Sequence, residues 1–220
     1  MGYLSWSRDG KFILFSSDRT GEFSLYRKAA SGADQEELLD EREGVSVPTD
    51  ASAKNLVLFT NTSAETGNDI WGLSVAGDRK AEPVLRSKSS ESRARLSPDG
   101  RWLAYESDET GSPKVYVVSF PDAKGKWQVS TEDATRPVWS RDGKELFYLS
   151  AGGKMVAVAV HSGVGFEHGA PKPLFGVRMS PTSPFDINTD GRRFLILNGV
   201  EPDVTAPITL VVNWNVGLKK

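Results

Sequence analysis

The sequence predicts an all-β fold built from similar antiparallel sheets, and three observations lead to it. A short phrase recurs along the chain: serine, any residue, Asp-Gly and a basic residue, with its aspartates at Asp9, Asp99 and Asp142 and a looser copy at Asp190. A short apolar run follows each Asp-Gly pair, as a strand follows a tight turn. No helical periodicity of apolar residues extends over a useful length.

The spacing of the phrase sets the size of the repeat. Its aspartates are separated by 90, 43 and 48 residues, so the first interval is about twice the others. A degenerate copy over residues 52–59 lies near the middle of that interval and keeps the apolar run without Asp-Gly. Five copies of about 44 residues therefore fill the chain. A period of ~40–45 residues with short strands is typical of a β-propeller blade.

Each copy predicts four strands in a fixed order. The Asp-Gly pair forms a hairpin turn, because glycine adopts positive φ at little cost and aspartate accepts nearby backbone N–H groups. This turn joins an inner strand (3–7, 93–97 and 136–140) to a second strand (12–15, 102–105, 146–149 and 194–197). A third strand is predicted at 23–26, 70–75, 115–120, 155–160 and 208–214, and a weaker outer strand at 37–39, 83–85, 127–130 and 173–175.

We expect one propeller domain over residues 1–220, with repeats at about 3–43, 44–90, 91–132, 133–180 and 181–217. The last repeat has no predicted outer strand, so its blade is expected to be incomplete. The ring is then an open arc or a fragment of a larger propeller in a longer polypeptide. Bare blade faces and unpaired strand edges favour association, so self-association through an incomplete ring is a further hypothesis.

The composition narrows the classes of function. The formal net charge is −2 and no basic run is interleaved with aromatic residues, so nucleic acid is not an expected partner. The chain has no cysteine, which excludes disulfides and thiolate metal sites. No apolar stretch approaches the ~20 residues of a membrane-spanning helix, and no signal peptide is expected. We therefore predict no membrane insertion and no cofactor.

No catalytic or metal-ligating residue is predicted. The repeated aspartates fit turn chemistry better than catalysis. His161 and His168 are expected in a turn-rich loop around 162–169, where a separation of seven residues is not a metal-ligand spacing. Residues 186–191 begin like a calcium-binding loop, but position 197, where a bidentate glutamate would stand, is a leucine.

The predicted binding surface is the axial face on which each outer strand leads into the next inner strand. Six residues before the repeated aspartates, the copies place Tyr3, Arg93, Arg136 and Pro184. Tyrosine and arginine are enriched among residues that dominate binding energy, and loops on a rigid scaffold often carry function. Tyr3, Arg93 and Arg136 are therefore the predicted binding residues. The alternative is that the arginines pair with local carboxylates such as Glu91 and Asp133.

The repeated Trp/Leu-Ser-x-Asp-Gly-Lys/Arg phrase, followed by an apolar strand, resembles the TolB-like, WD-like β-propeller repeat over almost the whole chain. Three stretches, 115–130, 139–148 and 208–214, resemble the C-terminal propeller of acidobacterial-type, membrane-anchored serine/threonine kinases. That resemblance implies a sensor or interaction domain in an extracytoplasmic (periplasmic) location. No Gly-rich loop, His-Arg-Asp loop or Asp-Phe-Gly motif of a kinase is present in the sequence.

Two classes of function follow. The first is a non-enzymatic interaction or sensor module that binds a protein, a peptide or a small ligand on an axial face, as part of a longer receptor-like protein. The second is a carbohydrate hydrolase or lyase that uses carboxylates in the propeller channel. A pair of carboxyl groups ~5–9.5 Å apart in a cleft would favour the second class.

Overall fold

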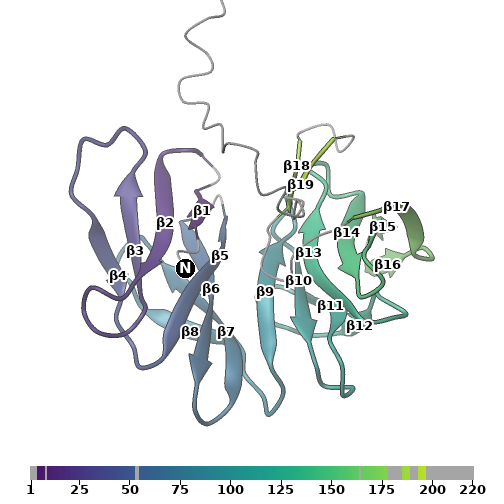
Figure 1. Ribbon diagram of the computed structural model, residues 1–220, viewed down its shortest axis with the longest axis horizontal. Helices are drawn as coiled ribbons and strands as arrows, with labels where there is room; N and C mark the ends of the chain where they lie inside the picture. The colour runs from purple at the N-terminus through teal and green to yellow at the C-terminus, as the bar shows by residue number, and fades with distance from the viewer. Residues whose placement is uncertain are drawn as a thin grey trace, which may run out of the picture.

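The computed structural model describes residues 4–7, 9–52, 55–163, 165–177, 185–188 and 193–196. All of its regular elements in these ranges are β-strands. They form antiparallel sheets that fan out around a common centre, with β1, β5, β9 and β13 on the inner side (Figure 1). Among the described residues no helix is long and apolar enough to cross a membrane.

The first three sheets each have four strands in sequential order. Their bounds are β1 Leu4–Trp6, β2 Phe12–Ser17, β3 Ser24–Ala29 and β4 Glu37–Asp40; β5 Val45–Ser52, β6 Leu56–Ser63, β7 Gly67–Ser74 and β8 Ala81–Leu85; and β9 Glu91–Leu96, β10 Trp102–Ser107, β11 Lys114–Ser119 and β12 Lys126–Gln128. Each is an antiparallel meander, the arrangement predicted for a propeller blade.

The fourth sheet has five strands and the fifth is a hairpin within the described residues. Their bounds are β13 Ala134–Trp139, β14 Glu145–Ser150, β15 Lys154–Ser162, β16 Phe166–His168 and β17 Lys172–Gly176, followed by β18 Phe185–Ile187 and β19 Phe194–Ile196. The start of β15 pairs with β17 and its end with β16, so two short strands share its outer edge.

The predicted loop around 162–169 is wrong in part, because a strand forms there. His161 lies in β15 opposite Glu167, and His168 ends β16 opposite Val160. The strand forms because the Phe166 side chain is only 3% exposed and packs against the rings of Trp102 and Trp127. Burial of an aromatic ring stabilises a short strand that local turn propensity does not predict.

The Ser-x-Asp-Gly phrase forms the predicted turn in three described copies. The Oγ atoms of Ser7, Ser97 and Ser140 donate to the aspartate Oδ1 two residues later, at 2.7, 2.6 and 2.7 Å. The same carboxylate oxygen accepts the backbone N–H of the basic residue that follows Asp-Gly. The glycines take φ of 70°, 74° and 72°, the left-handed region that glycine adopts most readily. The copy at Asp190 lies outside the described residues.

Apolar side chains from neighbouring sheets pack against each other at every junction. Leu14 and Leu25 meet Phe59 between the first two sheets, and Ile70 meets Leu103 between the second and third. Trp102 meets Tyr148 between the third and fourth sheets. Phe147 meets Phe185 between the fourth sheet and the last hairpin. The core is therefore a series of contacts between successive blades, as in other repeat architectures.

The described sheets do not close into a ring by strand pairing. Within the described ranges, no ladder joins the first sheet to the β18–β19 hairpin. Large apolar side chains are exposed at both ends of the arc: Leu4 and Trp6 on β1 are 70% and 60% exposed, and Leu195 on β19 is 77% exposed. The fold is thus an unclosed β-propeller of mostly four-stranded blades.

Candidate functional site

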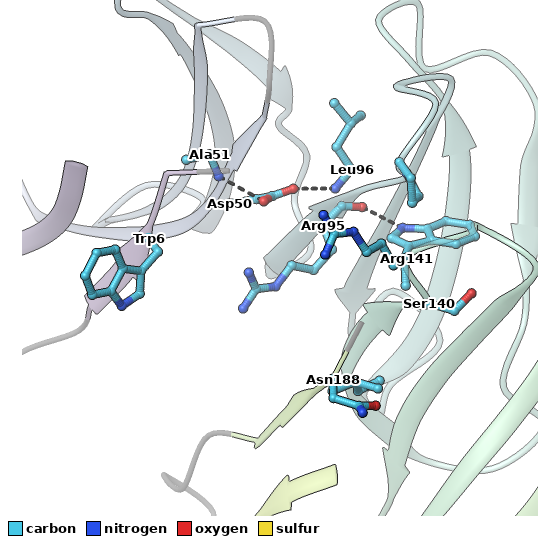
Figure 2. Close-up of a pocket in the computed structure, with 11 residues that line it drawn as sticks. Trp6, Asp50, Ala51, Arg95, Leu96, Ser140, Arg141 and Asn188 are labelled. Carbon is cyan, nitrogen blue, oxygen red and sulfur yellow. Dashed lines mark hydrogen bonds between the residues drawn. The ribbon is translucent and has the colours of Figure 1, made fainter. Parts of the chain in front are cut away.

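A pocket of about 340 Å³ lies where the inner strands run into the Ser-x-Asp-Gly turns. We call it the axial pocket, and it draws residues from all five sheets. Its lining comprises Trp6, Asp50, Ala51, Arg95, Leu96, Pro98, Trp139, Ser140, Arg141, Ile187 and Asn188. Residues from both ends of the arc therefore border one cavity, as expected when strands surround a common axis. Figure 2 shows how the labelled side chains face it.

The Asp50 carboxylate joins the second and third blades at the wall of the axial pocket. Its Oδ1 accepts the N–H of Ala51 at 2.9 Å, and its Oδ2 accepts the N–H of Leu96 at 2.8 Å (Figure 2). An ionised acceptor makes stronger hydrogen bonds than a neutral one. Asp50 therefore holds β5 against β9 and satisfies a backbone donor on the inner edge of β9.

Trp139 satisfies a second backbone group on the same edge. Its indole Nε1 donates to the carbonyl oxygen of Arg95 at 2.9 Å, and its side chain is only 8% exposed. Trp139 therefore connects the fourth blade to the third, and it fixes the backbone from which the Arg95 side chain extends. Trp6 is not buried in this way. It lies at the border of the pocket, and 60% of its surface faces solvent.

Two arginine side chains from neighbouring blades enter the axial pocket. Arg95 lies on β9 and Arg141 lies in the turn after β13; in Figure 2 both are drawn between Trp6 and Ser140. Within the part of the chain that is described, neither guanidinium group has a hydrogen bond or ion pair. The pocket lining thus combines two cationic groups, one carboxylate, and the rings of Trp6 and Trp139.

The predicted binding residues lie elsewhere along the inner strands. Arg93 and Arg136 each stand third in their strand, at a β-bulge, with φ of 52° and 60°. Neither lines the axial pocket, which lies at the opposite end of the inner strands from the predicted face. Tyr3 and Pro184 lie outside the described residues.

Arg93 and Arg136 both contact Glu106 at the end of β10. The Nη1 atom of Arg93 donates to both Glu106 oxygens, at 3.0 and 2.9 Å, and the backbone N–H of Arg136 donates to Oε1. The alternative prediction is that the arginines pair with local carboxylates. Arg93 does pair with a carboxylate, but that carboxylate belongs to Glu106 and not to Glu91 or Asp133. Asp133 instead accepts from Lys114 and Ser112. The bulge changes which residues face each other and so selects Glu106.

A weak sequence signal for the axial pocket was present in the repeat itself. Arg141 occupies the variable position of the Ser-x-Asp-Gly turn, where any residue is compatible with the turn geometry. The cross-blade contacts of Asp50 had no local signal, because its partner Leu96 is distant in the sequence.

A second pocket of about 250 Å³ lies laterally between the first two blades, lined in part by Phe12, Leu14 and Val57. Its charged groups are occupied: the Asp9 carboxylate accepts from Ser7 and from the N–H of Lys11, and Arg27 pairs with Glu37 at 2.6 Å. Because its charged groups already have partners, this pocket is a weaker candidate for ligand recognition than the axial pocket.

The titrating carboxyl groups fall into two kinds. The hydrogen bond from the preceding serine lowers the pKa values of the turn residues Asp9 and Asp142 below the ordinary value of 3.8. Burial instead raises the pKa of Glu91 above the ordinary 4.5, and the nearby Asp69 carboxylate adds to the effect. These groups lie in the turns and at the junction of the second and third blades.

No group of three or more His, Cys, Asp or Glu side chains suited to a metal ion occurs among the described residues.

No protein-family model matches the chain, and no curated protein matches its sequence. Solved structures do match its fold. A putative TolB from Agrobacterium tumefaciens aligns with a TM-score of 0.65 and 16% identity, over 80% of this chain and 65% of that one. TolB from Acinetobacter baumannii aligns with a TM-score of 0.67 and 18% identity, over 87% of this chain and 47% of that one.

The fold is also shared by enzymes. A structure from a study of two prolyl endopeptidases aligns with a TM-score of 0.52 and 13% identity, over 89% of this chain and 35% of that one. The chain spans less than two thirds of the length of either TolB structure. At these identities the likeness concerns the fold, and the chain is a TolB-like β-propeller.

Proposed function

We propose that the chain is a non-enzymatic interaction module that binds a protein or peptide partner in the axial pocket. One observation carries the proposal: the inner-strand ends of all five sheets surround a cavity that contains two arginines without described partners and a largely exposed tryptophan. Arginine and tryptophan are enriched among the residues that dominate binding energy. A rigid scaffold that presents such groups in a concave site supports recognition.

The resemblance to kinase-associated propellers adds a context to this proposal. In a longer receptor-like protein, the module would act as an extracytoplasmic sensor that reports the presence of its partner. Determining the complete open reading frame tests this context: a kinase domain and a membrane-spanning segment in the same polypeptide are expected.

The carbohydrate hydrolase or lyase has weaker support. Each of the two cavities has a single carboxylate in its described lining: Asp50 in the axial pocket and Asp9 in the lateral one. Both accept backbone hydrogen bonds that hold strands or turns. A glycosidase needs two carboxyl groups across one cleft, and the described lining does not supply that pair.

A peptide library tests the binding function. The immobilised protein is used to select from a display library of random dodecapeptides, and selected peptides are measured by fluorescence anisotropy. We expect Trp6→Ala to weaken their binding by at least about tenfold, as loss of an aromatic residue that dominates binding energy does. Leu174→Ala is the matched control, because Leu174 is a 40% exposed apolar residue of β17 outside the axial pocket.

Circular dichroism verifies that both variants fold. If the library yields no binding peptide, or if Trp6→Ala and wild type bind the selected peptides equally, the axial pocket is not the partner site and the proposal fails.

A further inference from the structure

The two arginines of the axial pocket differ from other arginines of the chain. Arg27, Arg42 and Arg93 each contact a carboxylate within 3.0 Å, and Arg79 contacts Glu37. Arg95 and Arg141 have no such partner among the described residues, although both enter a concave site. Two cationic groups without a described carboxylate partner therefore lie together at one cavity, which indicates an anionic ligand.

The residue type narrows the chemistry of that anion. A guanidinium group is planar and presents paired N–H donors, which match the two oxygens of a carboxylate or the oxygens of a phosphate. Asp50 in the same pocket repels anions, and the repulsion increases with the charge of the ligand. The two arginines and Asp50 together carry a formal charge of +1, which one carboxylate neutralises and a doubly charged phosphate exceeds, so the arrangement matches a singly charged carboxylate.

The inner edge of β9 is not open to an added strand at this position. The N–H of Leu96 is occupied by Asp50, and the carbonyl of Arg95 by the Trp139 indole. Recognition by strand addition needs free backbone groups along such an edge. Recognition in the axial pocket consequently depends on side chains, which makes it sensitive to the chemistry of the ligand's own side chains.

The size and the remaining lining suggest the form of the ligand. A volume of about 340 Å³ is near the lower end of the ~300–1,000 Å³ typical of ligand sites. This is room for one carboxylate side chain and a neighbouring group, rather than for a large molecule. The exposed indole of Trp6 offers an apolar face to that neighbouring group.

We propose that the axial pocket recognises an acidic peptide segment, with one Asp or Glu carboxylate held between Arg95 and Arg141 and an adjacent apolar or aromatic side chain against Trp6. This inference rests on the proposed function and specifies its ligand. Arg95 from the third blade and Arg141 from the fourth then act together as a carboxylate clamp.

The library selection described above also tests the clamp, with a different set of variants. The expected result is enrichment of peptides that contain Asp or Glu next to an apolar residue. In the tightest-binding peptide, replacing that Asp or Glu by Asn or Gln should weaken binding about tenfold to a hundredfold, because a hydrogen-bonded charge is lost. Arg95→Gln and Arg141→Gln should each cause a loss of similar size.

Two further variants separate charge from geometry. Arg95→Lys and Arg141→Lys keep the charge without the planar pair of donors, so they should restore only part of the affinity. Arg19→Gln is the control for net charge, because Arg19 lies in the turn between β2 and β3, at the opposite end of its blade from the axial pocket. It should bind like wild type. Circular dichroism verifies the fold of every variant.

The outcomes separate the two proposals. Selected peptides that depend on Trp6 but show no enrichment of acidic residues, or that bind Arg95→Gln and Arg141→Gln normally, overturn the clamp and leave the interaction module standing. Stronger competition by inorganic phosphate than by acetate overturns the preference for a carboxylate. A library with no binding peptide overturns both proposals.

Discussion

Replacing Glu106 by glutamine tests how two neighbouring blades are held together. Glu106 is only 5% exposed, and its carboxylate accepts from the Arg93 side chain and from the backbone N–H of Arg136. The first contact lies within the third blade and the second crosses to the fourth. Glu106→Gln keeps the volume and one acceptor oxygen but removes the negative charge.

The magnitude follows from these two contacts. A hydrogen bond to a charged acceptor contributes about 1 kcal/mol more than one to a neutral acceptor, which sets the loss at the Arg136 N–H. The Arg93 side chain is 45% exposed, so its ion pair contributes at most about 1 kcal/mol after solvent screening. We therefore expect a destabilisation of about 1–2 kcal/mol. For a chain of this size, that lowers the thermal midpoint by about 2–8 °C.

Urea unfolding followed by circular dichroism measures the change, and thermal unfolding provides a second value. Glu82→Gln is the matched control, since the Glu82 side chain is 68% exposed and its one ion pair among the described residues is with the exposed Lys80. It should change the free energy of unfolding by less than about 0.5 kcal/mol. If Glu106→Gln is as stable as Glu82→Gln, the carboxylate does not hold the two bulged strands, and the reasoning is refuted.

Three other expectations follow from the structure. Gly44→Ala should destabilise the protein by more than about 2 kcal/mol, because Gly44 has φ of 94° and a Cβ there would lie 2.0 Å from the Thr62 carbonyl oxygen. Gly21→Ala, at φ of 110° with no atom near the new Cβ, should cost only about 1 kcal/mol, and equal effects in urea unfolding would contradict the steric explanation. Asp50→Ala should cost about 1–3 kcal/mol by leaving the Leu96 N–H without its acceptor, and unchanged urea unfolding would show that the contact contributes nothing. The raised pKa of Glu91 predicts that stability falls as the pH rises from 4.5 through the folded-state pKa, because the unfolded chain loses that proton first; Glu91→Gln should remove this slope from thermal midpoints measured between pH 4 and 7, and parallel curves would contradict it.

The turn aspartates give a pH dependence of the opposite sign. Because the folded-state pKa values of Asp9 and Asp142 are lowered, their contribution to stability is present above pH 3.8 and is lost as the pH falls through the folded-state values. Thermal midpoints below pH 4 should therefore decline less steeply in Asp142→Asn than in wild type.

Local chemistry explains why much of the fold could be predicted. In the turns at Asp9, Asp99 and Asp142, the described hydrogen bonds of the serine hydroxyl and the aspartate carboxylate join residues at most five apart, so the phrase carries the information for its own geometry. The inner strand and the second strand follow from such a turn. The β16 strand did not, because it depends on Phe166 packing against rings from other parts of the chain.

The candidate site was harder to predict for the same reason. The position of Arg93 and Arg136 before the repeated aspartates predicts a binding role, but β-bulges at both positions alter the side-chain alternation, and the structure joins Arg93 to Glu106. Asp50 and Leu96 are 46 residues apart, and Trp139 and Arg95 are 44 apart, which is about one repeat. Aligning the repeat copies shows which residues they share, but it does not show which residues of successive blades contact each other.

The sequence alone determined the repeat, its period, the strand order within a blade and the chemistry of the turns, because each depends on interactions within a few residues. The tertiary structure decided which ends of the inner strands form a cavity, which carboxylates hold the blades together, and which arginines are left facing a pocket. Those outcomes depend on how blades about 44 residues apart in the sequence pack around one axis. No local sequence pattern predicts the contacts between them.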